Sequence, residues 1–285
     1  MAKLAVREIR EKLGDPRVAV VLNFDGLLFN TSSFHRHSFE VAVERVTGQR
    51  RSITDEERRT LAGLTDQQIA GYLLRNPSPR TSPPSVSRDL PKTNGHVDKT
   101  TQQLIEEREK ALLERVGGVG FMQFVIPGVP PFMYQLKTLG RKAGIATSSP
   151  DSFVIKLLQE TGFPGFGVRM TDVIPPSAIV GSTKLTQIEL EMEGSDGAGP
   201  RNIHKPDPAS VYLAAIAALD AEGKGHMPRE IIYFGGKLID AVTVHQEESV
   251  HGVIVSDNGV ATQLRDAGIG NMTHVDSLIP LFRIE

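Results

Sequence analysis

The feature that most constrains this chain is the alternation of short apolar runs with helical patterns. The apolar runs predict strands at Arg17–Leu22, Lys142–Ala146, Ile231–Phe234 and Val253–Val255. The first of them, RVAVVL, is continuously apolar, as is typical of a strand buried on both faces of a parallel sheet. We therefore expect an α/β fold whose core is a Rossmann-like parallel sheet.

A block of helical patterns interrupts this alternation directly after the first strand. We expect residues 1–32 and 126–285 to form the α/β core domain and residues 33–125 to form an inserted α-helical cap. Inside the block, residues 76–95 are rich in Pro and Ser and predict a loop or a disordered insert. The break falls at the carboxyl end of a strand, where α/β proteins open onto their sites.

A second departure from the alternation follows a strand that we expect at Gly167–Thr171. Residues 172–203 contain the sequence GSDGAGP and predict a long irregular insert. The regular pattern then resumes with a helix at Pro208–Leu219.

Charge and composition narrow the classes of partner. The net charge is −2, so nothing indicates a nucleic-acid or membrane-surface partner. Cysteine is absent, which excludes disulfides, thiolate metal sites and a Cys nucleophile. No apolar run approaches the roughly 20 residues of a spanning helix, and the first residues carry both charge signs instead of a secretory or transit signal. We expect a cytoplasmic protein.

Polar residues follow several of the predicted strands. Asn23 and Asp25 come after the first strand, Thr147 after the second, and Asp240 after the Ile231–Phe234 run. Lys205 lies in the segment HKPDP before the next helix. Because the carboxyl ends of parallel strands meet at one edge of a sheet, we expect these side chains to converge.

The ordered set of motifs resembles the haloacid dehalogenase superfamily, in the helical-cap branch similar to β-phosphoglucomutase and phosphoglycolate phosphatase. The motifs are NFDGLL, TSSP, HKPDP and GGKLID, in the order in which the family carries its nucleophile, hydroxyl, lysine and acid motifs. The segments IPGVPPFMYQLKTLGRKAGIATSSP and NMTHVDSLIPL add to the resemblance, which covers nearly the whole chain outside the two inserts. It implies phosphate-ester chemistry through a phospho-aspartate.

The departures from the family pattern bear directly on that chemistry. Asn23 stands at the position of the nucleophilic Asp, and an amide oxygen is a much poorer nucleophile than a carboxylate. Gly236 stands at the position of a Mg²⁺-binding acid, and Asp240 remains there as the residual ligand position. Asp25 retains the position of the general acid and base. With the family's metal held by the nucleophile, the carbonyl of the second Asp and the lost acid, we expect no cofactor.

The phosphate-binding positions of the family are retained. Thr147 and Ser148 offer hydroxyl donors, Lys205 offers a positive charge, and Gly26 offers a backbone N–H. We also expect Lys237 or Lys205 to pair with Asp25 or Asp240 in a cleft that holds no metal.

These observations favour a pseudophosphatase that acts by binding a phosphorylated ligand or a protein partner. One alternative is an active phosphatase or phosphomutase-like enzyme that uses Asp25 in an atypical site and requires Mg²⁺. Another is a structural subunit of a larger assembly.

Overall fold

The computed structural model describes residues 4–61, 64, 66–76, 98–116, 121–196, 203–225, 227–256 and 258–281. The chain divides into a core unit, Met1–Asn30 with Gly120–Glu285, and a helical unit, Thr31–Val119. The sequence patterns placed the two boundaries after residues 32 and 125, a few residues beyond those of the structure.

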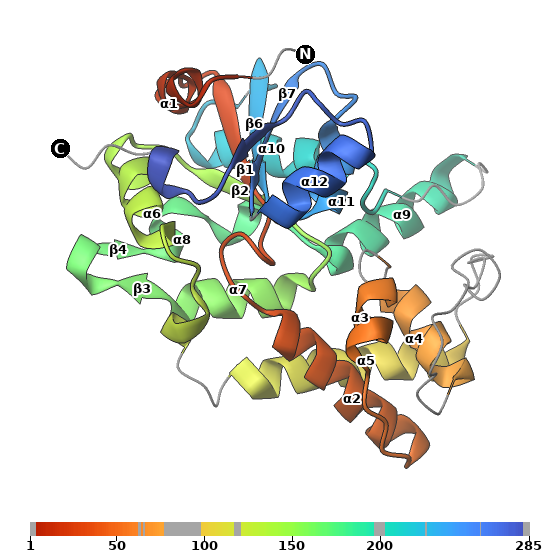
Figure 1. Cartoon of the computed structure of the whole chain (residues 1–285). Coiled ribbons are helices and arrows are strands. Elements are labelled where there is room, and N and C mark those ends of the chain that lie inside the picture. The colour runs from red at the N-terminus through yellow and green to blue at the C-terminus, as the bar shows by residue number, and fades with distance from the viewer. Residues whose placement is uncertain are drawn as a thin grey trace. The chain divides into compact units, whose positions relative to one another are not determined.

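The core unit is built on a six-stranded sheet in which all neighbouring strands are parallel (Figure 1). The strand order is β5-β2-β1-β6-β7-β8. The strands are β1 (Val18–Leu22), β2 (Ala143–Ala146), β5 (Ile179–Val180), β6 (Glu230–Gly235), β7 (Val250–Val255) and β8 (Thr273–Val275). The predicted α/β class with a Rossmann-like sheet is confirmed.

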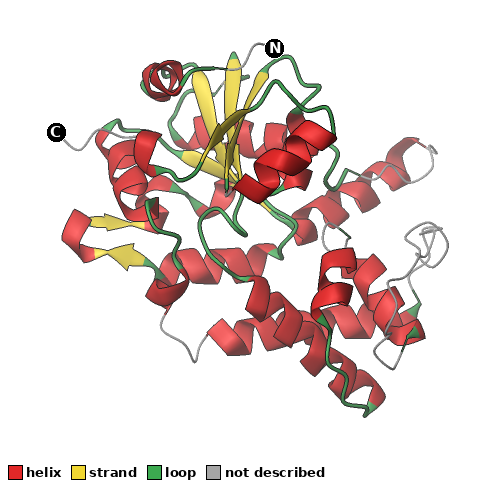
Figure 2. Ribbon diagram, viewed as in Figure 1, coloured by secondary structure: helices red, strands yellow, loops and turns green. Residues whose placement is uncertain are grey.

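Helices cover both faces of this sheet (Figure 2). All five residues of β1 are buried, as expected of a central strand. On one face Val21 and Tyr233 join the core that α10 and α11 help to build. On the other, Phe234 packs against Phe132 of α6, with ring centroids 5.3 Å apart. The helices are α1 (Val6–Leu13), α6 (Val129–Thr138), α7 (Asp151–Glu160), α8 (Met170–Val173), α9 (Ser182–Asp196), α10 (Ala209–Ala221), α11 (Leu238–Val244) and α12 (Asn258–Asp266), with 3-10 turns η1 (Phe121–Phe124), η2 (Pro164–Phe166), η3 (Pro176–Ala178) and η4 (Ile279–Leu281).

The prediction of an irregular insert at 172–203 is wrong over most of the segment. Its described part holds the second half of α8, the turn η3, the strand β5 and the helix α9. Strand β5 pairs in parallel with β2 and forms one edge of the main sheet. The run of three apolar residues between Ser177 and Gly181 is too short to reveal a strand by periodicity.

The strand predicted at Gly167–Thr171 is also only partly correct. Residues Val168–Arg169 form β4, which pairs antiparallel with β3 (Gly162–Phe163) in a separate two-stranded sheet. The chain then turns directly into α8. This hairpin lies apart from the main sheet because neither of its strands hydrogen-bonds to one of the six parallel strands.

The helical unit consists, in its described part, of α2 (Ser32–Thr47), α3 (Asp55–Leu61), α4 (Asp66–Arg75) and α5 (Lys99–Val116). Its apolar core gathers Phe39, Tyr72 and Leu104 from three of these helices. The predicted Pro- and Ser-rich insert at 76–95 lies outside the described residues except for Asn76. Across the part of the chain that the structure describes, no helix combines the length and the apolar character needed to cross a membrane.

Candidate functional site

The carboxyl ends of β1, β2 and β6 bring polar side chains together inside the core unit. Asn23 and Asp25 follow β1, Thr147 follows β2, and Asp240 lies in the first turn of α11 after β6. Lys205 reaches the same edge from the segment before α10. None of these five residues is more than 8% exposed. These five residues, all predicted from the sequence, therefore form one buried cluster, which we call the strand-edge cluster.

Asp240 is held by five hydrogen bonds. Its Oδ1 accepts from Lys205 Nζ at 2.7 Å and from Tyr233 Oη at 2.8 Å. Its Oδ2 accepts from Asn23 Nδ2 at 3.1 Å and from the two backbone N–H groups that begin the turn before α11, at 2.9 and 3.0 Å. Burial alone would raise the pKa of Asp240, but the charge and hydrogen bond of Lys205, together with the charge of Lys237 and the hydrogen bond of Tyr233, lower this pKa. The buried carboxylate is thus held ionised.

Lys205 uses all three of its ammonium hydrogens within the cluster. Besides Asp240, Nζ donates to Tyr233 Oη at 2.6 Å and to Asn23 Oδ1 at 3.2 Å. An ammonium group has three donors and no acceptor. The predicted pairing of Lys205 with Asp240 is therefore found, and no N–H of Lys205 remains for a further ligand in this arrangement.

The orientation of the Asn23 amide follows from its neighbours. Its Nδ2 donates to the Asp25 carbonyl oxygen at 2.9 Å and to Asp240 Oδ2, while its Oδ1 accepts from Lys205. The carbonyl and the carboxylate only accept, and the ammonium only donates. A flipped amide would face acceptor with acceptor and donor with donor, so these partners permit one orientation only.

Asp25 contacts the end of β2 rather than Asp240. Its Oδ2 accepts from Ser149 Oγ at 2.6 Å and from Thr147 Oγ1 at 3.2 Å. Thr147 Oγ1 in turn accepts from the backbone N–H of Ser149 at 3.1 Å. Each hydroxyl has one proton, and both protons are directed at Asp25. Both hydroxyls therefore donate to the same carboxylate oxygen.

Two predicted phosphate-binding positions lie outside these contacts. Ser148 is exposed, whereas its neighbour Ser149 is buried and reaches Asp25. Gly26 is exposed with φ +84°, and its backbone N–H donates to the Phe29 carbonyl at 2.8 Å. In this arrangement the backbone donor expected at Gly26 is already used.

Gly236 leaves no room for the acid that the family resemblance places there. A Cβ atom at this position would lie 2.5 Å from the Gly26 carbonyl oxygen and 2.9 Å from its carbon. At the preceding Gly235, a Cβ would lie 2.3 Å from the Asp240 Cβ. The backbone after β6 therefore packs directly on the loop after β1, and a side chain at Gly236 requires that loop to move.

These residues do not fit a divalent cation. Among the described residues, no group of three or more His, Cys, Asp or Glu side chains is placed to hold a metal ion. Asp240 accepts five hydrogen bonds, although a carboxylate has about four lone-pair sites. The Asp25 carbonyl oxygen already accepts a hydrogen bond from Asn23. Mg²⁺ demands several hard oxygen ligands in near-octahedral geometry, which this edge does not offer.

Tyr233 and Ser149 also belong to the cluster, although the sequence patterns did not predict them as site residues. Tyr233 donates to Asp240 at 2.8 Å while accepting from Lys205. Burial, followed by the charge of Asp240, raises the pKa of Tyr233 well above 10.0, so the phenol stays protonated. A tyrosine inside the apolar run Ile231–Phe234, next to the end of that run, is the one signal that could have identified it.

Lys237 differs from Lys205 in its exposure and in the group that contacts Asp240. It is exposed, and its Cε lies 3.3 Å from the position that a Cβ on Gly26 would occupy. Its backbone N–H, rather than its ammonium, forms the hydrogen bond to Asp240. Its charge still contributes to lowering the pKa of Asp240. The ion pair in the cluster is made by Lys205.

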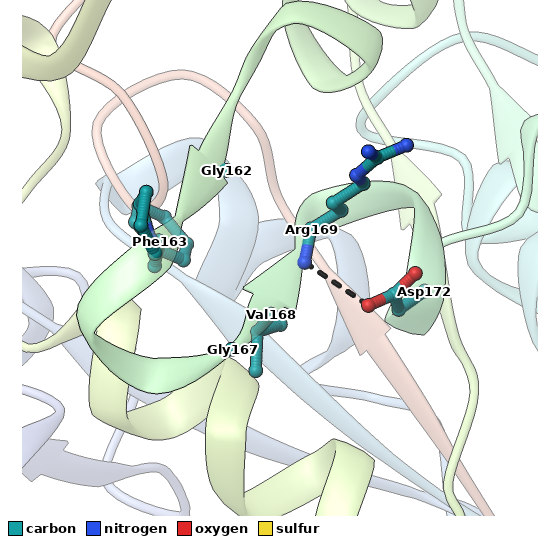
Figure 3. A pocket seen from close by; sticks show the side chains of 7 residues that line it. Gly162, Phe163, Gly167, Val168, Arg169 and Asp172 are labelled. Atoms are coloured by element: carbon teal, nitrogen blue, oxygen red, sulfur yellow. Dashed lines mark hydrogen bonds between the residues drawn. The ribbon is translucent and has the colours of Figure 1, made fainter.

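A cavity of about 430 Å³ lies elsewhere in the core unit, beside the β3–β4 hairpin. Figure 3 shows the backbone N–H of Arg169 donating to Asp172 while the Arg169 side chain extends away from that bond. Asp172 is also paired with Lys137, with Nζ to Oδ2 at 2.9 Å. The cavity gathers no catalytic constellation, so the strand-edge cluster remains the candidate site.

The sequence matches the family model of the haloacid dehalogenase-like hydrolases over residues 20–167, slightly more than half of the chain. The protein belongs to this family. The matched region begins within β1 and includes Asn23, Asp25 and Thr147, so the family match covers two of the three strand ends that form the cluster.

Several solved structures share the fold of this chain. CbbY from Rhodobacter sphaeroides, in a mutant complex with xylulose-(1,5)bisphosphate, has a TM-score of 0.60 at 15% identity, covering 91% of this chain and 94% of that one. β-Phosphoglucomutase from Clostridium difficile gives 0.57 at 14%, covering 93% and 92%. A putative phosphoglycolate phosphatase from Lactobacillus delbrueckii subsp. bulgaricus gives 0.54 at 19%, covering 92% and 95%. No curated protein sequence matches significantly.

Proposed function

We propose that this haloacid dehalogenase-like protein does not form a phospho-aspartate and acts by binding. The observation that carries the proposal is the set of contacts of Asn23. Its amide stands at the nucleophile position of the family and is bound on both sides, to Asp240 and the Asp25 carbonyl through Nδ2 and to Lys205 through Oδ1. A neutral amide oxygen that already accepts from an ammonium is a poor attacking group.

The contacts of the cluster favour a protein partner over a small phosphorylated ligand. A phosphate dianion offers only acceptors, so it needs donors. The three N–H groups of Lys205 and the hydroxyl protons of Thr147 and Ser149 are directed at acceptors within the protein. To bind phosphate, these donors must leave a buried carboxylate unpaired, which costs free energy. A partner that recognises the outer surface of the protein leaves the cluster intact.

Thermal unfolding in the presence of phosphate tests this preference. A ligand that binds only the folded state raises the melting temperature, and the rise grows with the logarithm of ligand concentration above the dissociation constant. We expect inorganic phosphate and a sugar phosphate to leave the melting temperature unchanged relative to potassium chloride at the same ionic strength. The opposite result is a melting temperature that rises with phosphate concentration in the wild-type protein. If Thr147→Ala weakens this rise and the control Thr138→Ala, on an exposed helix surface, does not, the ligand is a phosphorylated molecule.

Turnover separates the proposal from the active alternative. Mg²⁺-dependent hydrolysis of p-nitrophenyl phosphate is expected at the level of the buffer control. Hydrolysis that Asp25→Ala abolishes would establish an enzyme with an atypical site. If phosphate leaves the melting temperature unchanged and the protein co-purifies in fixed stoichiometry with other subunits, its role is that of a subunit in an assembly.

A further inference from the structure

The amide of Asn23 lies between two oxygens that come from different parts of the core unit. One is the carbonyl oxygen of Asp25, in the loop after β1, at 2.9 Å from Nδ2. The other is Oδ2 of Asp240, in α11, at 3.1 Å. A single NH₂ group thus joins a main-chain carbonyl and a buried carboxylate, a pair of oxygens of the kind that a divalent cation bridges in proteins.

The charge of this group of atoms is already balanced. Asp240 contributes one negative charge, and Lys205 contributes one positive charge at 2.7 Å from its Oδ1. Both side chains are almost completely buried, so solvent screens this pair weakly. The amide is neutral and supplies two further donors. A divalent cation added beside Asp240 would bring two further positive charges to a buried ion pair that is already neutral.

We propose that the Asn23 amide and the Lys205 ammonium together take the place of a divalent cation and form a metal-independent latch between β1, the segment before α10 and the β6–α11 turn. The approach of Gly236 to the Gly26 carbonyl supports this inference. With 2.5 Å between that oxygen and a Cβ at Gly236, the backbone fills the space in which a third acidic ligand would lie. The same close packing is compatible with a latch made of hydrogen bonds.

The latch has a consequence that can be measured without any activity assay. Asn23→Asp exchanges the donating NH₂ for a carboxylate oxygen, which then faces the Asp25 carbonyl and Asp240 Oδ2. The donor that lay between these oxygens is then lost, and Lys205 is left to balance the charge of two buried carboxylates. Such an arrangement is strongly destabilising unless a cation enters it. We therefore expect this one substitution to make the stability of the protein depend on Mg²⁺.

The test is thermal unfolding of the wild-type protein and of Asn23→Asp, each in EDTA and in millimolar MgCl₂. We expect the wild-type melting temperature to be the same in both buffers. For Asn23→Asp we expect a fall of roughly 5 °C or more in EDTA, with a substantial part recovered in MgCl₂. Asn23→Ala serves as the matched control, because it removes the amide without adding a charge; its melting temperature is expected to fall without recovery in Mg²⁺.

Three results would overturn the inference: a wild-type melting temperature that rises with Mg²⁺, an Asn23→Asp variant as stable as wild type in EDTA, or a destabilised variant that Mg²⁺ does not rescue. Should Asn23→Asp fail to fold, calorimetric titration of the wild-type protein with MgCl₂ decides, since saturable binding contradicts the latch and an absence of binding heat supports it. The inference does not rest on the proposed function. Failure of this test would say nothing about turnover. Detection of turnover, in turn, would not alter the melting temperatures expected here.

Discussion

Nδ2 of Asn23 lies 3.1 Å from Oδ2 of Asp240, and this contact joins the end of the central strand β1 to the first turn of α11. The pair places an amide donor where members of the haloacid dehalogenase-like family, by the resemblance of their motifs, carry a nucleophilic carboxylate. Because the amide donates to Asp240 rather than repelling it, the two residues stabilise each other without a cation. This relationship underlies the following predictions.

Tyr233→Phe tests the phenol that bridges the ion pair. The substitution keeps the ring and removes the hydroxyl that donates to Asp240 and accepts from Lys205. Hydrogen bonds to charged groups contribute about 1.5–3 kcal/mol, so we expect a loss of that size in the free energy of unfolding, measured by urea denaturation. Tyr134→Phe, on an exposed ring, is the control and is expected to change it by less than about 0.5 kcal/mol. Equal effects of the two substitutions would show that the bridge contributes nothing.

Acid unfolding tests the buried carboxylate of Asp240. Its pKa is lowered in the folded protein from 3.8, so the ionised group stabilises the fold fully above that pH. The contribution is lost as the pH falls through the lowered folded value. Asp240→Asn leaves Lys205 without its counter-charge and is expected to cost about 3–5 kcal/mol at neutral pH.

The difference in the free energy of unfolding between wild type and Asp240→Asn should become smaller as the pH falls below 3.8, because the wild-type carboxylate becomes protonated. Denaturation curves collected from neutral pH down to strongly acidic pH measure this directly. The exposed Asp266, replaced by Asn, provides a control in which no such trend is expected. A difference that stays constant down to about pH 2 would contradict the assignment.

Gly236→Ala tests the packing of the backbone after β6. The added Cβ would lie 2.5 Å from the Gly26 carbonyl oxygen, so the loop after β1 must shift. Overpacking of this kind costs about 1–3 kcal/mol. Gly270→Ala is the matched control, since nothing lies within 4 Å of a Cβ there and its φ is not positive. If both variants have the same free energy of unfolding, the close approach does not constrain this position.

Much of the cluster could be predicted from the sequence because parallel topology alone brings strand ends together. The apolar run before Asn23 and the order of Thr147, Lys205 and Asp240 along the chain were sufficient to predict that these side chains converge. The partner of each side chain was not predictable. Lys205 rather than Lys237 pairs with Asp240, and this depends on the path of the segment before α10, which no local pattern encodes.

The parts that sequence patterns missed have a common physical cause. Strand β5 has two residues, Ile179–Val180, and becomes a strand only because it pairs with β2. Tyr233 lies in an apolar run that predicts a buried strand, and its hydroxyl acquires a role only through Lys205 and Asp240. Ser149 is selected over Ser148 by the direction in which the chain leaves β2. In each case tertiary contacts, not local preference, determine the outcome.

The most direct test of the central claim is the rate of p-nitrophenyl phosphate hydrolysis by the full chain across a series of Mg²⁺ concentrations, with Asn23→Ala measured in parallel. We predict that both proteins stay at the rate of the buffer control and that Mg²⁺ changes neither rate, because an amide oxygen is a poor nucleophile and the oxygens beside Asn23 already accept hydrogen bonds from it. Turnover by the wild-type protein that rises with Mg²⁺ and disappears in Asp25→Ala would contradict this account.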